Sequence, residues 1–503
     1  MRARDETVQL TQRSARDLAA DVGTGALSAV EVMRAHLDRI AEVNRAVNAV
    51  QDLRTQTALD RARAVDAVPT EERRKLPLAG LPVAVKDLAP AAGFRYTQGS
   101  PIFAGRVADA DALFVARMRA AGAVVIGKTN TPEFGLGSHT FNPVYGATRN
   151  PYDLSRTAGG SSGGAAAALA ARMLPVADGS DTGGSLRNPA SFCNVVGLRP
   201  SPGRVPNLPS AFPYSTISVK GPMGRSVRDT ALLMSTMVGM NHRDPVSVDD
   251  DPARYLAVAE SAPGARIGRQ RVRAAWTADF NGFFPVSRSV LEVLEPVVAQ
   301  LGDAGIEVEA AHPDIRGAKE AFRTLRGLQM LAALGPLEEK HPERLKDDAR
   351  WNVQVGRDVT GDQAARAQQV QGLCFQRMAE FLPREGAGTT TAGYDILITP
   401  TCQVTPFELG RRYPREIDGT AMADYLDWMT LPSIISVTNH PAVSVPVGFT
   451  AEGHPVGLQV VGSYRNEAVL LDYAKRIEDL CGSGAVVPQT DFSAPQERFP
   501  DIR

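Results

Sequence analysis

Residues 156–200 read RTAGGSSGGAAAALAARMLPVADGSDTGGSLRNPASFCNVVGLRP, and their glycine- and alanine-rich composition sets them apart from the rest of the 503-residue chain. A turn rich in glycine and serine at residues 159–164 opens directly into an alanine-rich helix at residues 165–171. A short strand is expected at residues 174–177, before a second glycine-rich turn at residues 179–184. A Gly/Ser linker would not continue into an apolar helix. Because alanine has so little side-chain bulk, we expect this helix to lie deep in the molecule with closely packed backbones.

Outward from this stretch, expected helices and strands alternate along the whole chain. Helical patterns occupy residues 28–64, 110–121, 285–304 and 467–481. Buried strands are expected at residues 78–85, 123–126, 307–309, 394–400, 442–447 and 457–461. Because neither a repeat nor a clear linker divides it, the chain is predicted to form a single large α/β domain over residues 1–503. A central, mixed, twisted β-sheet would be covered by helices. Residues 1–65 form an N-terminal helical segment, and residues 313–390 a variable, mainly helical peripheral insert.

The composition is that of an ordinary globular protein and excludes several classes of partner. There are 55 basic and 56 acidic residues, so no basic surplus favours nucleic acid or an anionic membrane. The four cysteines are widely spaced without a CxxC pair, and the seven histidines show no HExxH spacing, so we expect free thiols and no metal site. Residues 1–21 do not resemble a signal peptide, and we find no apolar run long enough to span a membrane. The expectation is a cytoplasmic protein.

A phosphate-loop pattern at residues 122–129 is interpreted as a coincidence. The letters GAVVIGKT match GxxxxGK[ST], but that mechanism needs a strand before the first glycine and a helix after the lysine. Here a predicted helix comes first, and the four variable residues are themselves typical of a strand. Nucleotide binding is therefore not expected.

The second glycine turn places Ser185 in a setting suited to nucleophilic attack. It ends the run DTGGS at residues 181–185, where two glycines allow several backbone N–H groups to converge on one point. Such donors can hold an oxyanion. A serine hydroxyl is a weak nucleophile, however, and needs a base. Neither glycine-rich segment contains a histidine.

Lys86 is the candidate base. It follows the apolar run LPVAV at residues 81–85, so its amine is expected at a buried strand end. Burial lowers the pKa of a lysine, and an uncharged lysine is a competent general base. Taken alone, Lys86 would more often be a salt-bridging residue, for instance with Asp87.

Together these residues resemble the amidase signature family. The segment 156–200 carries GGSSGG, DTGGS and GLRP, and Ser161 and Ser185 lie 24 positions apart, as do the family's bridging serine and nucleophile. The agreement extends to GLPVAVKD, GKTN, DILITPT and PVGLQ at residues 80–87, 127–130, 395–401 and 455–459. Residues 110–133 and the GATRNP of residues 146–151 are also similar to the nylon-oligomer, or cyclic amide, hydrolase branch. Residues 313–390 match nothing in the family pattern and correspond to its variable region.

The resemblance implies a hydrolase that cleaves carbon–nitrogen amide-type bonds through an acyl-serine intermediate, with no metal or organic cofactor. Ser185 would be the nucleophile, Ser161 the proton relay after a cis peptide bond from Gly160, and Lys86 the general base. The oxyanion would be held by backbone N–H groups of four consecutive residues, Thr182, Gly183, Gly184 and Ser185.

Other polar residues near the turns are expected to support this triad. Ser162 would hold it by hydrogen bonds. Asp181 and Arg187 could contact substrate, but an ion pair that locks the turn is favoured. Cys193 is predicted to be buried core and not a nucleophile, whereas Cys402 follows a strand end that could border the pocket.

The substrate class stays open between aryl, alkyl and cyclic amides, nylon-type oligomers, esters and carbamates. Apolar residues near the expected pocket loops favour a hydrophobic or aromatic small molecule; they are Phe134, Leu136, Phe141, Tyr145, Phe212 and Trp428. The alternative is the amidase subunit of a tRNA-dependent glutamine amidotransferase, although residues 134–138 and the insert do not resemble that branch. A catalytically silent scaffold is disfavoured because all three triad positions are intact. A homodimer would follow family habit.

Overall fold

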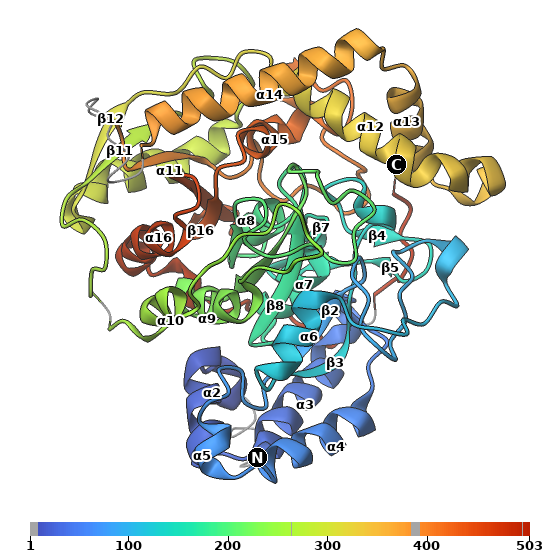
Figure 1. Cartoon of the computed structure of the whole chain (residues 1–503), viewed down its shortest axis with the longest axis vertical. Coiled ribbons are helices and arrows are strands. Elements are labelled where there is room, and N and C mark those ends of the chain that lie inside the picture. Colours follow the sequence, from blue (N-terminus) through green and yellow to red (C-terminus); the bar gives the residue numbers. More distant parts are fainter. Residues whose placement is uncertain (1–8, 263, 384–392, 495, 503) are drawn as a thin grey trace.

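An eight-stranded mixed β-sheet runs through the centre of the molecule in the computed structural model (Figure 1). The strand order is β12-β11-β13-β17-β16-β9-β10-β8. Strand β11 pairs in parallel with β12 and β13, and the other neighbours pair antiparallel. The strands are β8 Val176–Asp181, β9 Val196–Arg199, β10 Val219–Gly224, β11 Val272–Trp276, β12 Ile306–Ala310, β13 Ile396–Pro400, β16 Ala442–Phe449 and β17 Pro455–Gly462. This arrangement confirms the predicted α/β class with a central mixed sheet.

The structure describes residues 9–262, 264–383, 393–494 and 496–502. Residues 1–8 of the predicted N-terminal segment and residues 384–390 of the predicted insert therefore lie outside the described residues. Within the described ranges, we find no helix of the length and apolarity needed to cross a membrane.

The motif GLPVAVKD at residues 80–87 contributes one strand to a smaller sheet, whose strand order is β1-β3-β2. Its strands are β1 Val50–Gln51, β2 Pro82–Lys86 and β3 Val124–Thr129, and β2 pairs in parallel with β3. The strand predicted at residues 78–85 was placed too early, because Gly80 turns with a φ of 69° against Ala29. The strand predicted at residues 123–126 was too short. Lys128 consequently lies buried inside β3, which rules out a phosphate-binding loop there.

Helices surround both sheets (Figure 1). Those of the N-terminal third are α2 Ala15–Thr24, α3 Ala29–Val47, α4 Thr55–Asp66, α5 Thr70–Arg73, α6 Leu113–Ala120, α7 Gly163–Ala170 and α8 Arg187–Phe192. The others are α9 Val227–Met237, α10 Ala253–Glu260, α11 Arg288–Gln300, α12 Ala318–Lys340, α13 Asp347–Arg357, α14 Gly361–Phe381, α15 Thr430–Val437 and α16 Glu467–Cys481. Short two-stranded pairs lie in the connecting segments: β4 Phe141–Asn142 with β5 Gly146–Ala147, β6 Arg149–Asn150 with β7 Asp153–Thr157, and β14 Glu416–Ile417 with β15 Thr420–Ala421. The final helix has the predicted bounds, whereas the helix predicted at residues 285–304 is α11 followed by a 3₁₀ turn.

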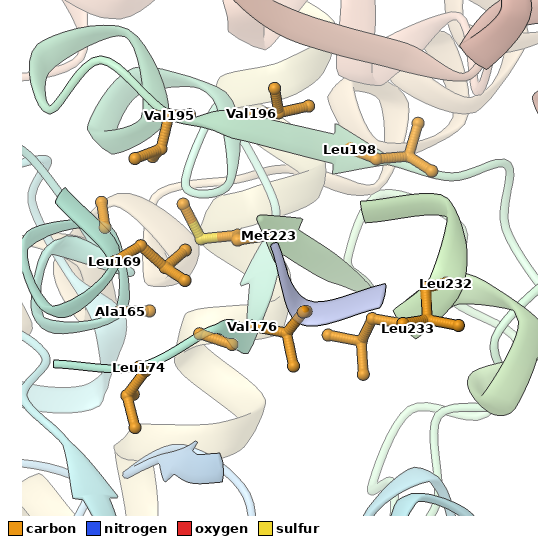
Figure 2. Packing of buried hydrophobic residues seen from close by; sticks show 14 of the residues in the cluster. Ala165, Leu169, Leu174, Val176, Val195, Val196, Leu198, Met223, Leu232 and Leu233 are labelled. Carbon is orange, nitrogen blue, oxygen red and sulfur yellow. The ribbon is translucent and has the colours of Figure 1, made fainter. Parts of the chain in front are cut away.

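The alanine-rich helix α7 is buried along its whole length. Figure 2 shows Ala165 and Leu169 on its surface facing Met223 of β10 and Val176 of β8. A Cβ on Gly164 would lie 2.3 Å from the backbone nitrogen of Asn130, so the backbones approach as closely as the sequence predicts. The long helices α12 and α14, drawn in yellow and orange, form an arch along one margin of the molecule (Figure 1).

Candidate active site

Lys86 ends strand β2 where the small sheet meets the edge strand β8 of the large one. Its backbone N–H donates to Asp178 Oδ1 at 3.1 Å, which joins the two strands. The side chain is 1% exposed. Its Nζ lies 2.8 Å from Ser161 Oγ, 2.8 Å from Ser162 Oγ and 3.0 Å from Ser180 Oγ. The amine is therefore surrounded by three hydroxyl groups.

Burial lowers the pKa of Lys86 well below its ordinary value, and the nearby cation Lys220 lowers it further. Asp178 and Asp181 oppose this shift with smaller effects. An uncharged amine has two N–H donors and one lone pair, so among three hydroxyl neighbours it can donate twice and accept once. The surroundings of Lys86 thus match the neutral form that a general base requires.

Ser161 follows a cis peptide bond from Gly160, as the family resemblance implied. The Gly160 carbonyl accepts a hydrogen bond of 2.7 Å from Ser138 Oγ. A Cβ on Gly135 would lie 3.5 Å from Ser161 Oγ, so the loop around Gly135 passes directly beside Ser161, the predicted relay. This packing fixes the position of Ser161 from two sides.

The turn that carries Ser185 lies against the turn that carries Ser161. Ser162 N–H donates to the Ser185 carbonyl at 3.2 Å. Ser185 itself is 8% exposed, so it is nearly buried but accessible. The structure therefore brings Lys86, Ser161 and Ser162 into contact and joins the Ser185 turn to them, while the direct link from Ser161 Oγ to Ser185 Oγ stays a prediction.

Asp181 and Arg187 form the ion pair that the sequence favoured. Arg187 donates to both carboxylate oxygens, at 3.0 and 2.9 Å, and Arg199 adds a third contact at 3.1 Å. All three side chains are fully buried. Burial alone would raise the pKa of Asp181, but Arg187 and Arg199 hold it well below its usual range. Asp181 is thus a permanent anion at the base of the turn.

The Asp181 carboxylate also binds Gly184, one of the four predicted oxyanion-hole residues, and this contact changes the role expected for it. The Gly184 N–H donates to Asp181 Oδ1 at 2.9 Å, so it supports the turn instead of pointing at substrate. The sequence could not reveal this, because a peptide N–H has the same identity in either role. Thr182, Gly183 and Ser185 stay as predicted donors. Gly183 packs so tightly against Phe322 of α12 that a Cβ would lie 2.5 Å from the ring.

Three polar residues of the site were missed from the sequence: Asp178, Ser180 and Arg199. The first two alternate along β8 and therefore lie on one face of the strand. The strand predicted from the sequence ends at residue 177 and gives way to a turn at residues 179–184, whereas β8 continues to Asp181. The period-two spacing of Asp178 and Ser180 was the signal that could have found them.

The remaining candidates divide into core and pocket. Cys193 is buried as predicted, and burial raises the pKa of its thiol. Cys402 is 3% exposed and lies 3.5 Å from Asn188 Oδ1. Trp428 is buried and stacks on Phe192 with ring centroids 6.0 Å apart. Leu136 and Tyr145 are buried as well, which weakens the aromatic-substrate argument for these three residues.

Residues 31–471 match the family model described as Amidase. An acylamidase from Rhodococcus erythropolis is 34% identical over 472 residues, which cover 92% of this chain and 94% of that protein. One glutamyl-tRNA(Gln) amidotransferase subunit, from Nocardia farcinica (strain IFM 10152), is 35% identical over 487 residues, covering 90% of this chain and 94% of that one. The solved structure of 6-aminohexanoate cyclic dimer hydrolase matches with a TM-score of 0.81 and 29% identity, over 95% of this chain and 99% of the other. The similarity to each extends over nearly the full length.

Proposed function

This chain belongs to the amidase signature family of hydrolases acting on amides, and we propose that it cleaves its substrate through an acyl-serine intermediate on Ser185. The observation that carries the proposal is the 2.8 Å contact between Lys86 Nζ and Ser161 Oγ in a buried setting that favours the uncharged amine. Ser161 would connect this base to the nucleophile.

In the first half of the reaction, Ser185 Oγ attacks the carbonyl carbon while its proton passes to Ser161, whose own proton passes to Lys86. The C=O bond becomes a single bond, and its oxygen carries the negative charge toward the N–H groups of Thr182, Gly183 and Ser185. When the carbonyl re-forms, the C–N bond breaks. The leaving nitrogen takes a proton from Ser161, which is replenished from Lys86.

In the second half, water takes the place of the amine. It loses a proton through Ser161 to Lys86 and attacks the acyl carbon, and the ester bond to Ser185 breaks. The proton returns to Ser185 Oγ, and a carboxylic acid leaves. Each proton that Lys86 gains is given back, so the relay ends as it began.

The hydrogen bonds around Lys86 support Ser161 as the relay. Ser162 Oγ lies 3.4 Å from the Ser180 carbonyl and can use its proton there. Ser161 is thereby the better placed hydroxyl to donate to the lone pair of the amine. Ser162 would hold the amine in place, which is the supporting role predicted from the sequence.

We propose small-molecule aryl, alkyl and cyclic amides as the substrate class, with esters and carbamates as further acyl donors for the same serine. The relatives named above as an acylamidase and a 6-aminohexanoate cyclic dimer hydrolase favour this range. The test is labelling by a fluorophosphonate probe together with turnover of a panel of p-nitroanilides, p-nitrophenyl esters and aryl carbamates. Loss of both in Ser185→Ala, with retained folding, is the expected result; full activity in that variant would end the proposal.

The second candidate function is that of an amidotransferase subunit, which the full-length similarity to the amidotransferase protein of Nocardia farcinica favours. In that role the same triad would release ammonia from glutamine for a partner protein. Measured glutaminase activity, together with partner subunits recovered by affinity purification from the source cells, would support it. Turnover of p-nitroanilides by the isolated chain without glutaminase activity would favour the free-standing amidase.

A further inference from the structure

Lys220 of strand β10 lies beside the candidate base, although nothing in the signature pattern marks it. Strand β10 pairs antiparallel with β8, and the register sets Lys220 opposite Ser180. Directly opposed residues project from the same face of a sheet. Because Ser180 Oγ contacts Lys86 Nζ at 3.0 Å, this face of β10 borders the amine.

The charges around Lys86 do not balance. Asp181 is held by Arg187 and Arg199. Asp87 lies 3.8 Å from Lys128, with both side chains fully buried. That leaves Asp178, which is attracted by Lys128, Lys86 and Lys220 together and whose own pKa is raised by burial.

Asp178 accepts a hydrogen bond from the backbone N–H of Lys86. Its carboxylate also attracts the Lys220 side chain electrostatically. One carboxylate can neutralise one ammonium group. Lys86 is 1% exposed and is surrounded by hydroxyl groups, whereas Lys220 is only half-buried. Burial lowers the pKa of Lys220 as well, but Asp178 opposes that shift. The second lysine is therefore the better site for the positive charge.

We propose that Lys220 is a positioning residue which, paired electrostatically with Asp178, keeps a positive charge beside Lys86 and so maintains that amine as an uncharged base. This inference rests on the proposed function, because it assigns Lys86 the role of general base. A fixed cation next to a catalytic lysine is a known way to depress its protonation. Lys220 acts through Lys86 and needs no contact with substrate.

The test is the pH dependence of the second-order rate of fluorophosphonate labelling in the wild type, Lys220→Gln and Lys220→Arg. Without the neighbouring charge Lys86 binds its proton more tightly, so the acid limb of Lys220→Gln is expected to move up by about one pH unit. Arginine keeps its charge, so the limb of Lys220→Arg should lie at or below that of the wild type. The alkaline plateaus should agree within about twofold, because Lys86 is neutral there in all three proteins.

Lys319→Gln is the matched control, since Lys319 pairs with Asp427 on another part of the surface and its loss removes the same net charge. Its acid limb should coincide with that of the wild type. A merely structural role for Lys220 would lower the plateau without moving the limb, and coincident limbs for Lys220→Gln and the wild type would overturn the inference. If Lys220→Gln does not fold, a limb of Lys220→Arg above the wild-type limb would overturn it too. Absence of labelling in the wild type at every pH would instead refute the proposed function.

Discussion

Replacing Lys86 by methionine should change how the stability of the protein depends on pH. In the unfolded chain this lysine is protonated up to a pKa of about 10.4. In the folded protein, burial and then Lys220 lower its pKa well below that value. Between the two values the unfolded state binds one more proton than the folded state, so the free energy of unfolding rises with pH.

The size of this pH dependence follows from the one proton by which the unfolded and folded states differ. A full proton difference corresponds to about 1.4 kcal/mol per pH unit, and it accumulates over the pH range that separates the folded from the unfolded pKa of Lys86. Lys86→Met lacks this contribution. The variant also leaves three hydroxyl groups without their shared partner, which costs about 1 kcal/mol each but does not depend on pH. The difference in unfolding free energy between the wild type and Lys86→Met therefore has two parts. Its slope with pH reports the protonation of Lys86, whereas its constant part reports the lost hydrogen bonds.

The assay is urea-induced unfolding of the wild type and Lys86→Met, followed by tryptophan fluorescence at several pH values in that range. The stability of the wild type relative to the variant is expected to increase steadily with pH. Lys75→Met is the control, because Lys75 lies on the surface with its side chain 68% exposed and should give a difference that is flat with pH. A flat difference for Lys86→Met would mean that the folded protein holds Lys86 charged, and the argument for a neutral base would fail.

Three further predictions concern the turns. Ser185→Ala should abolish fluorophosphonate labelling and amide turnover while the thermal midpoint stays within a few degrees of the wild type, as checked by circular dichroism. Ser162→Ala should lower kcat by about 10- to 100-fold with little change in KM, because Lys86 loses one of its three hydroxyl neighbours; an unchanged kcat would contradict this role. Gly183→Ala should cost about 1–3 kcal/mol in urea unfolding, since its Cβ would lie 2.5 Å from Phe322, whereas Gly105→Ala, with open space around it, should change stability by less than about 0.5 kcal/mol.

The sequence predicted correctly those helices whose ends depend on nearby residues, such as an apolar periodicity or a capping serine. Helix α16 follows its apolar periodicity from Glu467 to Cys481. Helix α3 begins as expected after Ser28, whose side chain forms a capping box with Glu31. Strand β8 was truncated in the prediction because residues 178–181 are polar or glycine. Those residues are buried in a strand only because Lys86, Arg187 and Arg199 satisfy them from other parts of the chain.

The residues of the candidate site also fall into two groups, those that a local motif marks and those that only the pairing of distant strands brings together. The signature motifs name Lys86, Ser161 and Ser185; the structure brings the first two into contact, and the catalytic role of each stays a prediction. Asp178 and Lys220 could not be predicted, since their positions depend on the pairing of β8 with β10 and on the contact of β8 with β2. The Gly184 N–H was assigned to the oxyanion for a related reason: the sequence does not show that the Asp181 carboxylate reaches back to it.

The small residues of the stretch 156–200 let the surrounding elements pack closely around Lys86, the proposed base, and so exclude water from it. A Cβ on Gly179 would lie 2.7 Å from Ser162 Oγ, and one on Gly164 would lie 2.3 Å from the backbone of Asn130. Either side chain would push apart the elements that enclose Lys86, and Ser162 is one of its direct partners. Because burial is the largest cause that lowers the pKa of Lys86, water admitted by such a displacement would favour the protonated amine. The glycine and alanine content of residues 156–200 thus supports the proposed chemistry at Lys86, which lies 75 positions before its partner Ser161 in the sequence.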